Sequence, residues 1–330
     1  MSNDFFRRHP TRREFLTVGS GIFVALSMPL ALRRRMPLVR RSFPLMGTIA
    51  EVQVAHRDER FAEAAIDAAL VELQRVERMM TRFRPDSDIG RANLGAGREG
   101  IAVSAETALV IETALHWSSV SDGRFDPAIG AASELWDVLH RHEPPPEERV
   151  DRLASRGFWR KVDIAQHGGA PAVRYEDRDL HLDLGAIAKG YGVDRAVAVL
   201  RARGVGHAIV TVGGDLYTLG ESPEGGPWRV GIRSPHDHNA LAATLEVADR
   251  AVATSGDYER FFRWHGQVYH HLIDPATGAP RRTPMHSATV LGADCMNADA
   301  AATAVFGLPH DAALRVVRRR ISGAEVIPLT

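Results

Sequence analysis

The sequence predicts an α+β fold made largely of antiparallel sheets with flanking helices. From residue 171 onward short strand patterns dominate, and they come in adjacent pairs separated by turns such as 176–178 and Gly213-Gly214. Adjacent pairs joined by short turns favour antiparallel pairing over a doubly wound parallel sheet. The Gly213-Gly214-Asp215 turn matches neither a Walker loop nor a dinucleotide-binding fingerprint.

The first half of the chain predicts one strand and two helices. Residues 48–55 alternate between apolar and polar side chains, as a half-buried strand does. Residues 59–80 repeat apolar side chains with the period of an amphipathic helix. A second helix is expected over 105–120 with Ser104 as its N-cap. The proline-rich residues 143–148 are expected to form an exposed excursion.

The second half predicts two helices among short strands. The helices are expected at 188–203 and 298–306. The strands are expected at 172–176, 179–183, 207–212, 215–219, 228–233, 242–247, 268–273 and 286–292.

Charge and cysteine content exclude several classes of protein. Lys+Arg and Asp+Glu both number 41, and this balance argues against a nucleic-acid binder, which needs a basic excess. The single cysteine, Cys295, excludes an intrachain disulfide framework and a multi-cysteine metal site. The sequence assigns Cys295 no role.

Residues 1–35 are expected to be a twin-arginine-type export signal, followed by one domain at 36–330. Arg12-Arg13 precedes a mostly apolar run from Leu16 to Leu32. This segment holds seven Arg against one Asp and one Glu, so the remaining chain carries a net charge near −5. The run is shorter than the roughly 20 residues of a membrane span. We therefore expect a periplasmic or exported protein, with membrane contact only through this segment if it is not cleaved.

The segment 182–194 is expected to connect a strand to a helix. It is rich in small residues and also contains polar side chains. It includes Asp183 and Lys189, the latter one of only two lysines in the chain. Small residues let the backbone approach a ligand, and a helix start offers N–H groups to an anion, so Lys189 suits a phosphate. The alternative, which explains the pattern equally well, is a tight connection between strand and helix that binds no ligand and leaves Lys189 in solvent.

Asp299 and Thr303 lie four residues apart on a predicted helix and would therefore share one face. A carboxylate and a hydroxyl could together bind a hard cation, with carbonyls, waters and phosphates completing its shell. The alternative is an aspartate near a helix N-terminus, favoured there by the helix dipole.

His271 precedes an Asp-Pro-x-x-Gly turn whose chemistry does not require it. It could serve as a general base or be an ordinary strand histidine. A zinc site is disfavoured because His270 and His271, as strand neighbours, would point to opposite faces. Ser255 lacks the flanking residues of a nucleophile elbow, which leaves it a positioning role at most.

Eight segments, in this order, resemble those of the ApbE family, the FAD:protein FMN transferases. The resemblance covers roughly residues 42–307. The segments are 43–48, 84–89, 122–127, 183–194, 213–215, 253–258, 271–278 and 298–304.

The resemblance implies two lobes around a flavin cleft and a Mg²⁺-dependent transfer of FMN. The FMN moiety of FAD would pass to a Thr or Ser hydroxyl of an exported or membrane-bound acceptor flavoprotein, with release of AMP. By the same resemblance, Mg²⁺ is bound by Asp299, Thr303 and the carbonyl of Ala186, and His271 is the base. The residues expected to contact FAD are Met46, Phe83, Arg124, Phe125, Asp126, Asp183 and Lys189.

Two other functions stay open at this point. In the first, water replaces the acceptor, which makes the protein a Mg²⁺-dependent FAD pyrophosphatase that yields FMN and AMP. In the second, the protein is a non-catalytic periplasmic flavin carrier. The presence of Asp299, Thr303 and His271 speaks against the carrier.

Overall fold

The computed structural model describes residues 23–25 and 36–330, apart from residues 98–99, 155–156, 176, 178 and 238. The predicted signal at residues 1–35 lies outside the described residues, apart from strand β1 (Phe23–Ala25), which pairs antiparallel with β9 (Trp228–Arg233). Within the described ranges, no helix combines the length and apolar character needed to cross a bilayer.

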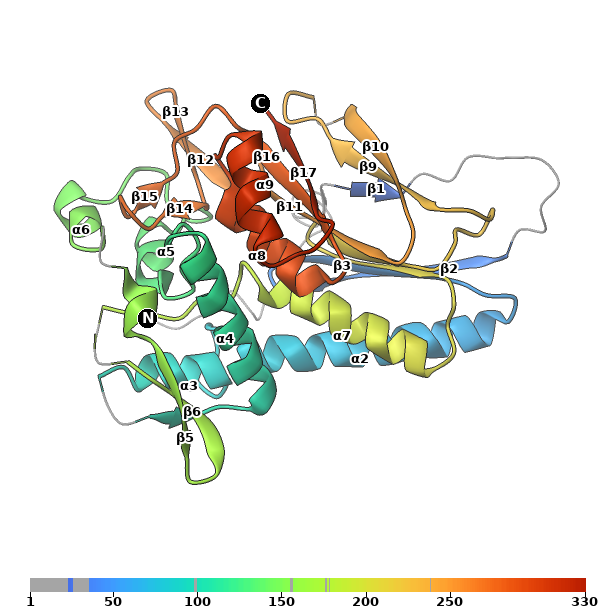
Figure 1. The fold of residues 1–330 in the computed structure, drawn as a ribbon, viewed down its shortest axis with the longest axis horizontal. Helices are drawn as coiled ribbons and strands as arrows, with labels where there is room; N and C mark the ends of the chain where they lie inside the picture. Colours follow the sequence, from blue (N-terminus) through green and yellow to red (C-terminus); the bar gives the residue numbers. More distant parts are fainter. Residues whose placement is uncertain are drawn as a thin grey trace.

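A large antiparallel sheet forms the centre of the molecule (Figure 1). In spatial order, its described strands are β17 (Glu325–Leu329), β16 (Ser287–Gly292), β11 (Arg250–Gly256), β8 (Asp215–Leu219), β7 (Ala208–Val212), β3 (Thr48–Ala55) and β2 (Leu38–Leu45). The pairings between them are antiparallel, which confirms the predicted fold class.

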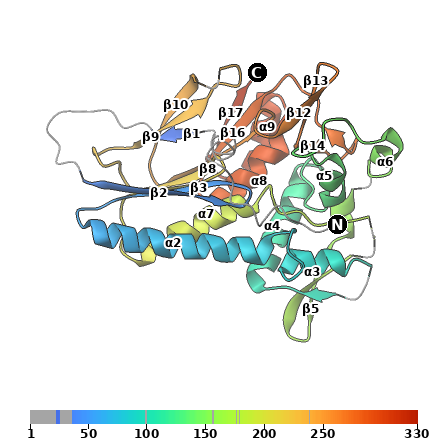
Figure 2. The same ribbon diagram turned by 180° about the vertical axis from the view of Figure 1, so that it is seen from behind.

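Three helices cover one face of this sheet: α2 (Glu59–Met80), α7 (Ala188–Ala202) and α8 (Cys295–Val305). Figure 2 shows α2 and α7 running side by side beneath the strands. Their apolar side chains pack with those of the sheet in one buried cluster. On the opposite face, β9 and β10 (Leu241–Val247) pack against β8 and β11 through a smaller apolar cluster.

The rest of the chain packs around a second buried core, which includes Trp117 and Phe306. Its helices are α3 (Asp88–Leu94), α4 (Ala105–Val120), α5 (Gly130–Trp136), α6 (Glu147–Asp151), a 3₁₀ turn at Phe158–Lys161 and α9 (His310–Arg318). Its strands are β4 (Ile101–Ala102), β5 (Asp163–His167), β6 (Ala170–Arg174), β12 (Phe261–Trp264), β13 (Gln267–His270), β14 (Ile273–Asp274) and β15 (Ala279–Pro280). Helix α8 contributes side chains to both cores.

Locally encoded elements form as predicted. Helix α2 spans the predicted 59–80, and α4 spans the predicted 105–120. The Ser104 side chain accepts the N–H of Thr107 at 3.1 Å, which is the expected N-cap contact. Helix α8 begins before the predicted residue 298, because the Asp294 side chain caps it by accepting the N–H of Asn297.

The strand predicted at 179–183 is wrong. Leu182 bonds through both its backbone groups to the side chain of Asn93, at 2.7 and 2.9 Å. The carbonyl of His181 accepts the N–H of Gly130, and the N–H of Asp183 bonds to Pro127. A side chain and a loop therefore satisfy this backbone in place of a neighbouring strand. The strand predicted at 268–273 is interrupted between β13 and β14, at the position of His271.

Candidate functional site

Helices α7 and α8 approach each other closely at Gly190, next to Asp299. A Cβ atom on Gly190 would lie 2.2 Å from the carbonyl oxygen of Cys295, so only glycine permits this approach. The Asp299 carboxylate is buried and accepts the N–H of Gly190 at 3.0 Å. The Nζ atom of Lys189 lies 3.1 Å from each of its two oxygens. The start of α7 therefore places Lys189 against the middle of α8.

Asp215, the first residue of β8, is a second buried carboxylate that contacts the Lys189 ammonium. Its other oxygen lies 3.3 Å from the N–H of Thr254. Burial and the nearby charge of Asp299 raise the pKa of Asp215 to about 7. Burial alone would lower the pKa of Lys189, but the two carboxylates raise it overall, so the ammonium stays charged. The sequence places Asp215 in the 213–215 segment of the family resemblance but assigns it no role at the site. The signal that points to it is an acidic residue at the start of a strand of otherwise uncharged side chains.

Thr303 lies one turn after Asp299 on α8, as the spacing predicts. Its Oγ1 atom is 2.9 Å from the Oγ atom of Ser255 on β11. This contact brings Ser255 to the site, and its positioning role stays a prediction. Carboxylate and hydroxyl oxygens from α8, β8 and β11 thus lie near the place where α7 and α8 approach each other.

These donors fit a hard cation such as Mg²⁺. They are oxygen atoms, and above the Asp215 pKa of about 7 two carboxylates face one ammonium, which leaves a net negative charge. Ala186, the third predicted ligand, lies in the turn immediately before α7. Among the described residues, no group of three or more His, Cys, Asp and Glu is arranged to hold a metal. A cation here would therefore draw on hydroxyl and carbonyl oxygens and on substrate phosphates, which is how Mg²⁺ is commonly bound.

His271 lies in the break between β13 and β14, facing Arg260. Its N–H donates to the carbonyl of Arg260 at 3.1 Å, and its Nδ1 atom is 3.4 Å from the same oxygen. Burial and then the positive charge of Arg260 lower the pKa of His271 to about 3, and the charge of Lys189 acts in the same direction. The imidazole is therefore neutral at physiological pH. With a proton on Nδ1 directed at the carbonyl, Nε2 is left as the proton acceptor.

Replacing His271 by glutamine is expected to make the free energy of unfolding less dependent on pH between about 6.5 and about 3. The unfolded chain takes up a proton near the ordinary pKa of 6.5, whereas the folded protein resists it down to about 3. The free energy of unfolding therefore falls as the pH decreases through this range. Urea unfolding at a series of pH values measures this slope, with His310→Gln, at an exposed side chain, as the control. Equal slopes in the wild type and His271→Gln would contradict the prediction.

Met46 lies in the turn between β2 and β3, where its φ of 50° is in the left-handed region. Its N–H donates to Glu77 Oε1 at 2.6 Å, which attaches the turn to α2. The next residue, Gly47, accepts a hydrogen bond from the Arg260 guanidinium at 2.8 Å. Arg260, which the sequence pattern does not single out, thus connects the Met46 turn to His271.

Asp183 and Phe83, both predicted to contact FAD, are brought together by Arg82. The Nε atom of Arg82 lies 3.0 Å from Asp183 Oδ2, and its guanidinium stacks 4.2 Å from the centroid of the Phe83 ring. Phe83 is 66% exposed, which is unusual for a phenylalanine and leaves its ring accessible. Arg82 also pairs with Glu134, which in turn contacts His181.

The other three predicted FAD contacts have protein partners in this structure. Phe125 is buried in the second core. The Asp126 carboxylate accepts the N–H of Ala128 at 2.8 Å, and burial raises its pKa to about 6. The Arg124 guanidinium donates to the carbonyl of Phe306 beyond the end of α8. Their contacts with FAD stay predictions.

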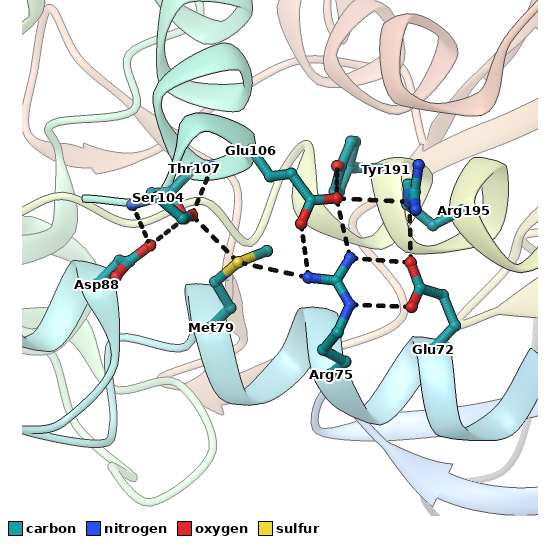
Figure 3. Close-up of polar contacts among 9 residues, drawn as sticks. All are labelled: Glu72, Arg75, Met79, Asp88, Ser104, Glu106, Thr107, Tyr191 and Arg195. Carbon is teal, nitrogen blue, oxygen red and sulfur yellow. Dashed lines mark hydrogen bonds and ion pairs between the residues drawn. The ribbon is translucent and has the colours of Figure 1, made fainter. Parts of the chain in front are cut away.

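A network of charged side chains fixes α7 to α2 and α4 (Figure 3). Arg75 of α2 binds Glu72 of the same helix and Glu106 of α4. From α7, the Tyr191 hydroxyl donates to Glu106 at 2.6 Å, and Arg195 pairs with Glu72 at 2.9 Å. Tyr191 lies two positions after Lys189, so the network holds the helix turn that presents the lysine.

Tyr191→Phe is expected to destabilise the protein by about 1.5–3 kcal/mol, because it removes a hydrogen bond to a charged group while keeping the ring. The matched control is Tyr217→Phe, whose hydroxyl bonds to the exposed Arg201 and should cost less. Chemical denaturation measures both differences. A smaller loss for Tyr191→Phe than for Tyr217→Phe would contradict the importance of the network.

Comparisons with known proteins all point to the same family. The sequence model of the ApbE family matches residues 46–327. The chain is 33% identical to the FAD:protein FMN transferase of Treponema pallidum (strain Nichols), over 87% of this chain and 83% of that protein. It is 32% identical to an FAD:protein FMN transferase of Klebsiella pneumoniae (strain 342), over 84% of each chain.

Solved structures agree with this result. The ApbE protein of Thermotoga maritima superposes with a TM-score of 0.79 at 28% identity, over 88% of this chain and 94% of that one. The flavin transferase ApbE of Vibrio cholerae superposes with a TM-score of 0.76 at 28% identity, over 89% and 93%. The family match spans most of the chain, and the fold and order of motifs agree with it. This protein therefore belongs to the ApbE family.

Proposed function

We propose that this protein transfers the FMN moiety of FAD, in a Mg²⁺-dependent reaction, onto a Thr or Ser hydroxyl of an acceptor flavoprotein and releases AMP. The observation that carries the proposal is the pair of buried carboxylates, Asp215 and Asp299, joined by the Lys189 ammonium, with the Thr303 hydroxyl one helical turn from Asp299. Its relatives are named FAD:protein FMN transferases, which supports the same reaction.

The chemistry requires a nucleophile, a base and neutralisation of charge. The acceptor hydroxyl oxygen forms a bond to the FMN phosphorus, and the bond from that phosphorus to the bridging oxygen breaks, so AMP leaves with the bridging oxygen. His271, hydrogen-bonded to the Arg260 carbonyl through Nδ1, accepts the hydroxyl proton at Nε2. Asp299, Thr303 and the Ala186 carbonyl would hold Mg²⁺, which would supply the charge neutralisation that attack on a pyrophosphate requires.

Lys189 and Arg260 add positive charge around the same place. Lys189 is held between two carboxylates, so it positions them as well as contributing its own charge. Arg260 holds the Met46 turn through Gly47 and carries the carbonyl that orients His271. The exposed Phe83 ring, stacked on Arg82, offers a surface for a flat aromatic group such as isoalloxazine.

We further propose that the protein is exported by the twin-arginine route and acts on an exported or membrane-bound acceptor. The motif at Arg12-Arg13 and the apolar run after it support this location. Replacing Arg12 and Arg13 by lysine should retain the protein in the cytoplasm, as measured by cell fractionation. Export that is unaffected by the double replacement would contradict the assigned route.

One experiment tests the reaction. The protein is incubated with FAD, Mg²⁺ and a candidate acceptor domain, and both the acceptor mass and AMP are followed. Transfer predicts that the acceptor gains the mass of the FMN moiety with one AMP released for each. Release of AMP without a gain in acceptor mass would show that the protein hydrolyses FAD. If FAD binds but neither product forms, the protein would be a flavin carrier.

A further inference from the structure

Helix α8, which carries Asp299 and Thr303, is bound at its N-terminus by a carboxylate from another helix. Asp194 of α7 accepts the N–H groups of Cys295 and Met296, each at 2.8 Å. The helix already has its own N-cap, Asp294. Asp194 is therefore a second carboxylate at this end, and it lies on the helix that carries Lys189.

The C-terminus of α8 is bound by two arginines from distant segments. The Nη1 atom of Arg281 donates to the carbonyls of Thr303 and Phe306, at 3.1 and 2.9 Å. The Nη2 atom of Arg124 donates to the same Phe306 carbonyl at 2.8 Å. Arg281 also donates to the carbonyl of Arg124 at 2.7 Å, so the two arginines form one unit.

The signs of these charges match the dipole of the helix, negative at its N-terminus and positive at its C-terminus. Burying a guanidinium is costly, and Arg281 is only 5% exposed. Glycine is the common way to end a helix, and Gly307 lies close after α8 with a φ of +83°. Termination of the helix therefore does not by itself account for the buried charge of Arg281 and the partly buried charge of Arg124.

We propose that Asp194, Arg281 and Arg124 are positioning residues that fix α8 along its axis, so that Asp299 and Thr303 stay aligned with the start of α7. An α-helix rises about 1.5 Å per residue, so a small axial shift would separate Asp299 from Gly190 and Lys189. Arg281 binds the backbone carbonyl of Thr303, the residue whose side chain is a predicted ligand. The inference rests on the proposed function, since it concerns the site proposed for Mg²⁺.

The test compares Mg²⁺ binding by the full chain and by variants of it, using calorimetry in the presence of FAD. Arg281→Lys keeps the charge but loses the planar fork, and Asp194→Asn keeps one acceptor but loses the charge. Each should raise the Kd for Mg²⁺ by about 10- to 100-fold, as loss of residues that orient metal ligands does. FAD affinity without metal and the circular dichroism spectrum should stay near wild type. The control is Arg282→Lys, at the adjacent exposed residue that contacts Gln267, and its Kd should not change.

The outcomes separate the two proposals. Wild-type protein that binds no Mg²⁺ overturns the proposed metal-dependent function, and the inference that rests on it. If the wild type binds Mg²⁺ and the folded variants Arg281→Lys and Asp194→Asn bind it with the same Kd, only the positioning role is overturned. If neither variant folds, Arg124→Lys is measured in their place, and its FAD affinity without metal is measured as well, because Arg124 is also a predicted FAD contact. An unchanged Kd in that variant likewise overturns the proposal.

Discussion

Asp299→Ala is expected to abolish metal-dependent turnover, lowering kcat by at least on the order of 10³-fold. Asp299 supplies the only charged side chain among the predicted Mg²⁺ ligands, and it is buried where water cannot easily replace it. A bound metal stabilises developing charge on a transferring phosphoryl group by several kcal/mol, which its loss removes. The measurement is AMP release as a function of Mg²⁺ concentration.

Two variants separate loss of metal from loss of structure. Asp299→Asn keeps the shape and an acceptor for the N–H of Gly190 but lacks the charge. It should fold, as judged by Tm, and still be strongly impaired. Thr303→Ser keeps the hydroxyl that contacts Ser255 and should retain most activity, whereas Thr303→Val should not. Full activity in Asp299→Ala would rule out the metal assignment.

His271→Ala is expected to slow transfer by about 10²–10⁴-fold while changing FAD binding far less. The imidazole is neutral and hydrogen-bonded through Nδ1, so it can accept a proton without contributing a charge to the binding of FAD. Single-turnover transfer and FAD titration measure the two effects separately. Because a more basic solution ionises more of the acceptor hydroxyl, the variant should recover part of its rate as the pH rises.

The control for this variant is His286→Ala. His286 is partly exposed and pairs with Asp257, and the structure gives it no contact with Asp299 or Lys189 among the described residues. Its replacement should leave transfer unchanged. Equal losses of transfer and FAD binding in His271→Ala would instead mean that this histidine only positions the flavin.

The elements that sequence patterns located are those whose signals are local. Helix α4 was predictable because the Ser104 cap and the helical run lie next to each other in the chain. Residues 179–183 have an apolar pattern typical of a strand, but their partners, Asn93 and the segment from Pro127 to the start of α5 at Gly130, are distant in sequence. A strand forms only where a neighbouring strand can pair with it, and the local sequence pattern does not show whether such a neighbour is present.

The same distinction applies to the site. Asp299 and Thr303 were identified because their spacing on one helix is itself informative. Asp215 and Arg260 were not, because each is one polar residue whose role depends on what packs against it. Only the folded chain places Asp215 against Lys189, and only there does the Arg260 carbonyl meet His271.

By itself, the sequence determined the α+β class, the positions of α2 and α4, the family resemblance and the candidate residues on α7 and α8. The tertiary structure alone decided that these two helices meet at Gly190, that Asp215 completes the buried charge group, and that Arg124 and Arg281 bind the end of α8. The physical reason is that propensity, capping and periodicity act over a few neighbouring residues. The burial of a charge and its choice of partner instead depend on segments far apart in the sequence, such as those of Gly190 and Asp299, which are 109 residues apart.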